Sequence, residues 1–231
     1  KAVKYALPHP LLDIADALQA GLKLESWPKA QYMGIPHVTV PTTAGTGAEG
    51  SAGAIIHNDQ TNVKGGIVAP FIDADICVLD AQLTVGLPPS LTASTGMDAL
   101  THALEGLASP IANLFSDAHC MLSAQRITRW LPVAVNDGTN PEARTEMLAA
   151  ACMAVNGYLA ALNATPVHNC SHAFGAMYHI PHGDANAVLL PIVMEVIPEL
   201  YAPQAERLAQ GLNMESNGKS VTRQGQAVNY S

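Results

Sequence analysis

The spacing of apolar residues divides the 231-residue chain into two parts. In the first part, residues 11–22 carry apolar side chains at helical spacing after two prolines, which predicts a surface helix with one buried stripe. Short apolar runs typical of strands lie at 37–41, 54–57 and 76–80. The small residues of 42–53 predict a loop after the first of these runs. Residues 1–87 are therefore expected to form an α/β region.

After residue 87 the pattern becomes helical. Segments rich in Ala, Leu and Met alternate with Gly, Asn and Pro breakers. They predict helices at roughly 91–107, 111–136, 141–163, 185–201 and 203–212. The tail after Asn213 is polar and rich in Gly and Ser, which predicts no regular structure there. We expect residues 1–87 to be the remainder of an α/β domain and residues 88–231 to form an all-helical domain.

Composition narrows the class of protein. An apolar fraction of 48% is ample for a packed core, and a net charge of −8 without a basic stretch argues against nucleic acid as a partner. No apolar run approaches the roughly 18 residues that a membrane helix needs, so we expect no membrane association. The cysteines are scattered without a C-x-x-C pair, which favours buried thiols in a reducing, cytoplasmic compartment. They are Cys77, Cys120, Cys152 and Cys170.

The first candidate site is the stretch GMDALTHALEG at 96–106. Asp98 and His102 stand four residues apart on a predicted helix, so their side chains project from one face. The alternative is an aspartate that caps its own helix beside a histidine hydrogen-bonded to it. Spacing alone leaves both interpretations open.

The second candidate is a cluster of four imidazoles between residues 168 and 182, in a chain with nine histidines. His168 and His172 are again four apart, and His182 follows in a Pro/Gly loop before the next helix. Zn or Fe(II) needs about four nitrogen or oxygen ligands from separate elements. Asp98 and His102 could meet His168 or His172 at such a point, with His182 completing a tetrahedron. For any single histidine, a core or surface imidazole with a backbone partner is the alternative.

The third candidate is the loop VPTTAGTGAEGSAG at 40–53, directly after a predicted strand. Small residues let backbone amides approach an anion, and Thr hydroxyls add donors, so the loop could bind phosphate or pyrophosphate. It has neither the G-K-[ST] of a Walker loop nor the G-x-G-x-x-G spacing of the dinucleotide fingerprint. A simple flexible connection fits the pattern equally well.

Taken together, three segments closely resemble the iron-containing (group III) alcohol dehydrogenase family. They are PTTAGTGAE at 41–49, LPPSLTASTGMDALTHALEG at 87–106 and HAFGAMYHIPHGDANAVLLP at 172–191. The resemblance extends from near residue 1 to about residue 195. It implies a dehydroquinate synthase-like build, with an N-terminal α/β dinucleotide-binding domain, a C-terminal helical domain and a divalent metal in the cleft between them.

The resemblance also implies roles for individual residues. The family's metal ligands, one Asp and three His, fall on Asp98, His102, His168 and His182. His172 matches a residue near the nicotinamide and substrate, and we expect it to relay the alcohol proton. His179 matches no functional position. The expected cofactor contacts are Thr42, Thr43, Thr46, Ser51 (where Thr is more usual), Lys64, Leu83 and Gly86.

The activity implied is metal-dependent, NAD(P)-linked oxidation of a small alcohol to an aldehyde or ketone, and the reverse reduction. Fe(II) is the first expectation for the metal and Zn the second, while NAD and NADP stay equally open. A homo-oligomer, dimer or larger, is expected. One alternative is a metal- and NAD-dependent lyase of the dehydroquinate synthase type, but its phosphate-bearing substrate needs several basic residues and the chain has eleven Lys and Arg. Another is a catalytically degenerate paralogue that keeps the fold as a scaffold.

The sequence departs from the family pattern at both ends. The family's G-G-G-S-x-x-D stretch, which binds the pyrophosphate, would precede Lys1, and the family continues past residue 231. The missing glycines favour the scaffold alternative, whereas the intact ligand set opposes it. We expect a partial chain.

Overall fold

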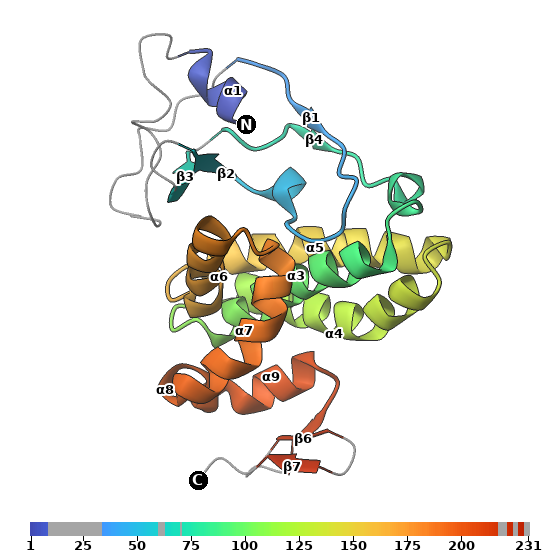
Figure 1. Cartoon of the computed structure of the whole chain (residues 1–231), viewed down its shortest axis with the longest axis vertical. Coiled ribbons are helices and arrows are strands. Elements are labelled where there is room, and N and C mark those ends of the chain that lie inside the picture. The colour runs from blue at the N-terminus through green and yellow to red at the C-terminus, as the bar shows by residue number, and fades with distance from the viewer. Residues whose placement is uncertain (9–33, 60–62, 70, 217–220, 224–225, 229–231) are drawn as a thin grey trace.

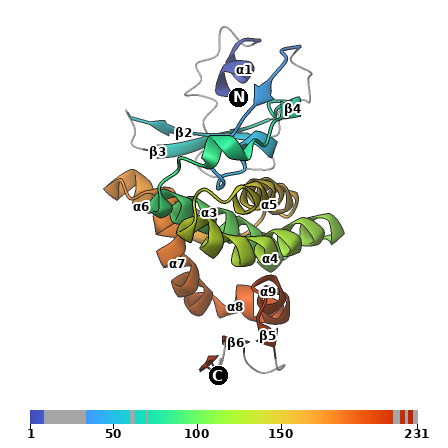
Figure 2. The same cartoon turned by 90° about the vertical axis from the view of Figure 1, so that its right-hand side faces the viewer.

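The α/β region lies over one side of a layer of helices in the computed structural model of the chain (Figures 1 and 2). The structure describes residues 1–8, 34–59, 63–69, 71–216, 221–223 and 226–228. The helix expected at 11–22 lies outside the described residues. The predicted order, α/β first and mostly helical second, is confirmed.

Two small sheets form the α/β region. Its elements are α1 (Ala2–Ala6), β1 (Val38–Thr39), η2 (Ala48–Gly50), β2 (Gly53–Asn58), β3 (Val63–Val68), β4 (Ile76–Cys77) and η3 (Ala81–Thr84). Strand β1 pairs in parallel with β4, and β2 pairs antiparallel with β3. The three strands expected from sequence are present, two of them shortened to two residues. Strand β3 was missed because Gly65 and Gly66 at its centre carry no side chain and weaken the strand signal.

The helical region follows directly. Its elements are α3 (Pro89–Ala108), α4 (Leu114–Asn136), α5 (Pro141–Ala160), α6 (Pro166–Tyr178), α7 (His182–Val196), α8 (Pro198–Tyr201), η4 (Ala202–Gln204) and α9 (Ala205–Gly211). The first three predicted helices match α3, α4 and α5 closely. The helix expected at 185–201 is divided into α7 and α8, and α7 begins earlier, at His182. His182 therefore lies in the first turn of a helix rather than in a loop.

Sequence-encoded caps set these boundaries. Asn113 accepts hydrogen bonds from the amides of Phe115 and Ser116 and forms a capping box with Ser116 at the start of α4. Proline occupies the first turn of α3, α5 and α6, where its missing N–H costs nothing. Helix α6 ends at His179, whose left-handed backbone (φ 55°) turns the chain toward α7.

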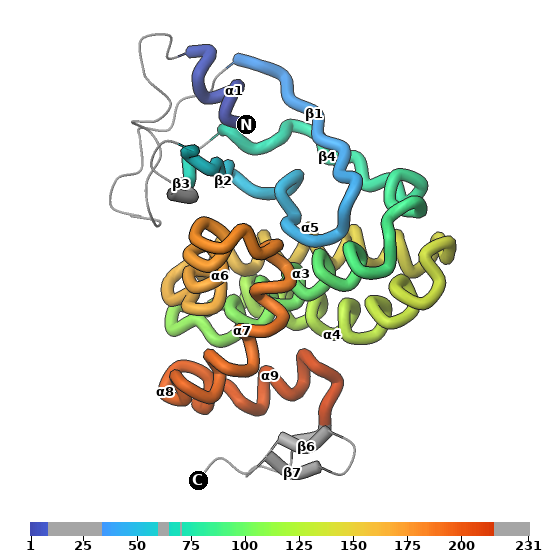
Figure 3. Tube along the Cα trace, in the orientation of Figure 1, coloured from blue at the N-terminus to red at the C-terminus, as the bar shows by residue number. Residues whose placement is uncertain are grey.

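Helix α3 is the central helix of the core, with 14 buried residues. Small residues allow α4 and α5 to pack closely against it. A Cβ atom added to Gly106 of α3 or to Gly157 of α5 would lie 2.5 Å from Sγ of Cys120 in α4. This close packing fixes the position of α3. Helix α7 then leads the chain from the layer that contains α3, α4 and α5 to α8 and α9 (Figure 3).

The C-terminal tail differs from the prediction. Strands β5 (Glu215–Ser216), β6 (Val221–Arg223) and β7 (Gln226–Val228) form an antiparallel sheet in the order β5-β6-β7. The expectation of no regular structure after Asn213 is therefore wrong, and the second part of the chain is mostly helical with a small sheet at its end. The surrounding Gly and Ser residues masked short segments with strand-forming Val and Thr.

Two further observations concern expectations from composition. Among the described residues, no single helix is long and apolar enough to cross a bilayer, although α7 and the segment Pro198–Gly211, bent by 89°, pass together on length and composition. All four cysteines are free thiols. Cys120 is buried as expected and Cys152 and Cys170 are partly buried, but Cys77, on a two-residue strand, is exposed.

Candidate metal centre

One face of α3 carries three buried ionisable side chains. Asp98, His102 and Glu105 occupy positions i, i+4 and i+7, which lie one above another on a helix. Asp98 and His102 are 3% and 7% exposed, and Glu105 is 2% exposed. Since ionisable groups are seldom fully buried without partners, this face requires partners from other elements.

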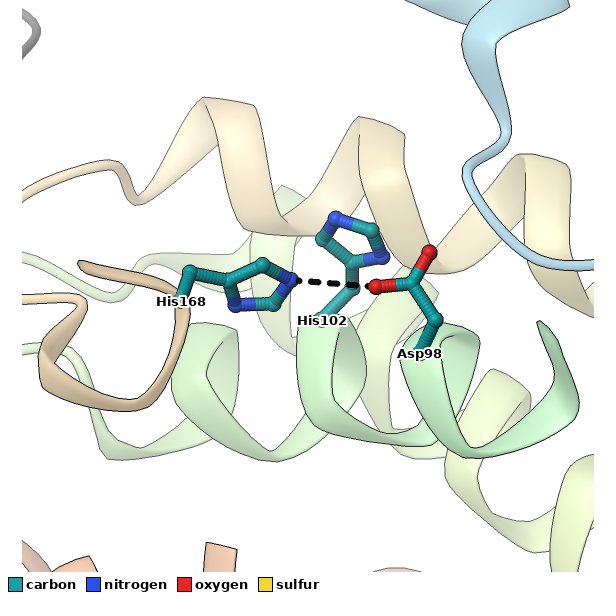
Figure 4. Close-up of side chains that lie close together, drawn as sticks. All are labelled: Asp98, His102 and His168. Carbon is teal, nitrogen blue, oxygen red and sulfur yellow. Dashed lines mark ion pairs between the residues drawn. The ribbon is translucent and has the colours of Figure 1, made fainter. Parts of the chain in front are cut away.

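Helices α6 and α7 supply these partners. Nε2 of His168 lies 3.5 Å from Oδ1 of Asp98, and Nε2 of His182 lies 3.3 Å from the same oxygen. Figure 4 shows Asp98 and His102 rising from one helix toward His168 on another. One donor atom from each of these three residues lies within 4.8 Å of the others. The structure thus brings together the four side chains that the sequence singled out as ligands.

Histidine rings extend the cluster outward. The rings of His102 and His168 are stacked with centroids 4.3 Å apart, and the centroids of His168 and His182 are 5.4 Å apart. His172, one turn after His168 on α6, has its ring centroid 4.8 Å from that of His182. His172 therefore stands beside the cluster, next to its most exposed member.

Two polar residues that sequence reasoning missed support the cluster. Glu105 accepts a hydrogen bond from Nδ1 of His168 at 2.5 Å. Asn186 of α7 is fully buried, donates to Oδ1 of Asp98 at 2.7 Å and also bonds with the hydroxyl of Ser171. Glu105 could have been found from the sequence, because its helical spacing places it on the same face as Asp98 and His102. Asn186 gave a weaker signal, its position four residues after His182.

The charges in the cluster shift the pKa values of its members in opposite directions. Burial raises the pKa of Asp98, but the neighbouring histidines outweigh burial and hold this pKa below its usual range. Burial, aided by His168, lowers the pKa of His102 to about 3. Burial also lowers the pKa of His168, yet its interactions with the carboxylates of Asp98 and Glu105 outweigh burial and raise the pKa to about 9. The two carboxylates thus favour the charged form of the His168 ring when no metal is bound.

The cluster lies at the wall of a cavity of about 870 Å³. Asp98, His102, His168, His172 and His182 all line this cavity. So do the loop residues Thr42, Thr43, Thr46 and Ser51. The cavity therefore joins the helical cluster to the Gly/Thr loop. The residue patterns left these two candidate sites separate, and only the family resemblance implied a shared cleft.

Two glycines seat the loop on the helices. A Cβ atom on Gly45 would lie 2.7 Å from Cβ of Thr95 in α3, and one on Gly47 would lie 2.4 Å from Cγ1 of Val155 in α5. Gly47 also has φ 57°, a left-handed conformation that glycine adopts without strain. Only residues without side chains allow the loop backbone to approach this closely, so the glycines determine where the Thr hydroxyls lie.

The remaining predicted cofactor contacts lie elsewhere. Leu83 of η3 and Gly86 after it are exposed, and neither is among the residues that line the cavity. Lys64 belongs to β3, with His57 opposite it, but its side chain lies outside the described residues. These three assignments stay predictions.

The donor set suits a divalent transition metal. Three imidazoles and one carboxylate are the ligand types that Fe(II) and Zn accept, and the four donors come from three helices. Among the described residues, Nδ1 of His102 is a buried nitrogen without a hydrogen-bond partner, and Nε2 of His168 has only the long contact of 3.5 Å with Oδ1 of Asp98. Such unsatisfied nitrogens are costly unless a further group binds them. The arrangement fits a metal held by the Asp98 carboxylate and the surrounding imidazoles.

Comparison with known proteins defines the class. Residues 92–229 match the C-terminal part of the Fe-containing alcohol dehydrogenase family. Residues 1–81 match iron-containing alcohol dehydrogenase. The chain belongs to the iron-containing alcohol dehydrogenase family, which confirms the resemblance seen in the sequence.

Individual relatives agree with this assignment. The probable alcohol dehydrogenase EutG of Salmonella typhimurium is 41% identical over 160 residues, which cover 69% of this chain and 40% of that protein. The crystal structure of the iron-containing alcohol dehydrogenase of Thermotoga maritima is 32% identical with a TM-score of 0.77, covering 92% of this chain and 55% of that one. Sulfoacetaldehyde reductase of Bifidobacterium kashiwanohense, solved in complex with NAD+, is 28% identical with a TM-score of 0.70, covering 94% and 61%. The chain spans about half the length of the relatives it matches.

Proposed function

We propose that the protein containing this chain oxidises a small alcohol to an aldehyde or ketone, and catalyses the reverse reduction, with NAD or NADP. One observation carries the proposal. A carboxylate and three imidazoles from α3, α6 and α7 converge on a cavity that the Gly/Thr loop also lines. Family membership supports a dehydrogenase over a lyase or a scaffold.

In this proposal one side of the cavity holds the metal. Asp98, His102, His168 and His182 are its ligands, with Fe(II) as the first choice and Zn as the second. A bound divalent cation supplies Lewis acidity that lowers the pKa of an alcohol hydroxyl. The ligands come from three helices whose packing is fixed by the core, so little reorganisation is needed on binding.

His172 is the residue we assign to proton transfer. It lines the cavity, is half-buried, and its ring lies beside that of His182. A histidine changes its charge near neutral pH and can accept the hydroxyl proton and pass it outward. Its position between the buried cluster and the outer cavity suits that transfer.

The other side of the cavity binds the nicotinamide cofactor in this proposal. The hydroxyls of Thr42, Thr43, Thr46 and Ser51 contact it, and Lys64, Leu83 and Gly86 are kept as further contacts. The NAD+ complex of the related sulfoacetaldehyde reductase supports a nicotinamide here. A nicotinamide held here would supply the hydride chemistry, and the loop would fix its position relative to the alcohol. We keep residue 87 as the proposed domain boundary and the cytoplasm as the proposed location.

The test compares two histidines. His182→Ala removes a proposed ligand, whereas His119→Ala removes an imidazole on α4 that bonds with the carbonyl of Phe115 and does not line the cavity. Elemental analysis is expected to give one divalent ion per chain in the wild type and in His119→Ala. His182→Ala is expected to lose both the ion and alcohol oxidation. Full metal content in His182→Ala would contradict the ligand assignment.

A further inference from the structure

We propose that Glu105 is a positioning residue for the metal site: it holds the His168 ring through Nδ1 and so presents Nε2 of that ring to the metal. The inference rests on the proposed function, because it assigns to Glu105 a role in the same metal centre. Glu105 does not reach the cavity, since it is not among the residues that line it. It acts through His168 alone.

Both carboxylate oxygens of Glu105 are engaged. Oε2 lies 2.5 Å from Nδ1 of His168, and Oε1 accepts a hydrogen bond from the backbone amide of Val167 at 2.7 Å. The Glu105 side chain is 0% exposed, so water cannot replace either bond. A carboxylate held at both oxygens cannot rotate, and the His168 ring bonded to it is held in one orientation.

The chemistry of the bond selects one form of the imidazole. A carboxylate that already accepts from an amide offers only acceptor sites, so Nδ1 of His168 must carry the proton. Nε2 is then the nitrogen left to bind a metal. Metal-binding histidines are commonly oriented by a carboxylate on the other ring nitrogen in this way. Glu105 thus fixes both the direction and the protonation of the ligand.

The location of Glu105 makes His168 its natural partner. Among the described residues, His168 is the cationic side chain with which Glu105 forms an ion pair. The negative charge of Glu105 also raises the pKa of the buried Tyr158 and Tyr201, after the larger effect of burial on each. Helix α3 therefore carries two proposed ligands and, one turn further, the carboxylate that orients a third from α6.

The test replaces the carboxylate with an amide of the same shape. In Glu105→Gln, the single amide oxygen can accept from either His168 or Val167 but not from both. The NH2 group then faces the other donor. Glu146→Gln is the matched control, because Glu146 of α5 forms a surface ion pair with Arg126 at 3.1 Å and does not line the cavity. Zinc affinity is measured by competition with a chelator, and the visible spectrum of the Co(II) form reports the ligand geometry.

We expect Glu105→Gln to raise the zinc dissociation constant about 10- to 100-fold and to change the Co(II) spectrum, with Glu146→Gln unchanged in both. An unchanged dissociation constant and spectrum in folded Glu105→Gln would overturn the inference, even if its melting temperature fell. A wild type that binds no metal would instead overturn the proposed function itself.

A second measurement needs no variant at position 105. In zinc-loaded wild type labelled with ¹⁵N-histidine, the His168 ring is expected to carry its proton on Nδ1, in a strong hydrogen bond. The signals of His168 are identified by their loss in His168→Gln. A His168 ring protonated on Nε2 would overturn the inference whether or not Glu105→Gln folds.

Discussion

The two walls of the cavity are built in different ways. The helical wall contributes Asp98, His102 and His168, all at most 7% exposed. Asp98 and His168 are bonded to other side chains, and the His102 ring stacks on the ring of His168. The loop wall contributes Thr42 and Thr46, both exposed. It is held by close glycine contacts and by hydrogen bonds from Lys1 and Cys77 to the end of the loop, at Ser51 and Glu49. Removal of one buried group leaves its bonded neighbours without a partner, whereas removal of one exposed hydroxyl does not disturb the others. Changes in the helical wall should therefore affect metal content, and changes in the loop wall should affect the cofactor alone.

The largest effect is expected from Asp98→Ala in the helical wall. Oδ1 of Asp98 lies within 3.5 Å of Nε2 of both His168 and His182, so the substitution removes a ligand and leaves both Nε2 atoms without this carboxylate. We expect no bound metal and a fall in alcohol oxidation of about 10³-fold or more. Asp184→Ala, which removes an exposed carboxylate from the first turn of α7, should retain metal and activity. Metal analysis and initial rates measure both outcomes, and a metal-replete Asp98→Ala would contradict the account.

A smaller effect is expected from Gly183→Ala, which pushes α7 away from α3. The added Cβ would lie 2.0 Å from the carbonyl oxygen of Ser94, a backbone atom that cannot move aside. We expect a loss of about 1–3 kcal/mol in the free energy of unfolding and weaker metal binding, because His182 precedes Gly183. The control is Gly86→Ala, where a Cβ would meet nothing within 4 Å. Denaturant unfolding should separate the two variants, and equal stability would show that α7 is not seated by this contact.

In the loop wall, Thr42→Val removes one hydroxyl from the cavity and keeps the shape of the side chain. The loss of a single hydrogen bond of about 0.5–1.5 kcal/mol should raise the KM for NAD(P) about 2- to 10-fold. Metal content should not change. Thr145→Val, on the exposed side of α5, should leave the KM unchanged. A loss of metal in Thr42→Val would remove the distinction between the two walls.

The smallest effect concerns pH and belongs to the helical wall. The pKa of His168 is raised from 6.5 to about 9 by its bonds with Asp98 and Glu105, which outweigh the lowering effect of burial. A raised histidine pKa stabilises the fold fully below about pH 6.5 and loses that contribution as pH rises through 9. Chelator-treated protein should therefore lose stability between these pH values, and His168→Gln should lose less over the same range. Thermal unfolding at several pH values measures this, and a flat profile in the chelator-treated wild type would contradict it.

The sequence predicted much of the helical wall because its signals are local. The spacing of Asp98 and His102, and of His168 and His172, depends only on the periodicity of a helix. The Pro-His-Gly stretch marked His182, although not its place in the first turn of α7. The bounds of α6 were not predicted, because His, Ser, Cys and Asn along it weaken the apolar pattern.

The parts that were missed depend on contacts between distant segments. Glu105 lies on the predicted face of α3, but its partners Val167 and His168 are 62 and 63 residues further along the chain. Asn186 likewise reaches Asp98 across 88 residues. Periodicity gives the face on which a residue lies and not the group opposite it, so supporting residues become visible only in the folded chain.

The most direct test of the central claim is anomalous diffraction from crystals of the metal-loaded protein, recorded at the absorption edge of the metal. The account predicts one strong peak per chain, about 2.0–2.2 Å from donor atoms of the four proposed ligands. These are Asp98, His102, His168 and His182. A peak held by other residues, or no peak between these four in protein that contains stoichiometric metal, would contradict it.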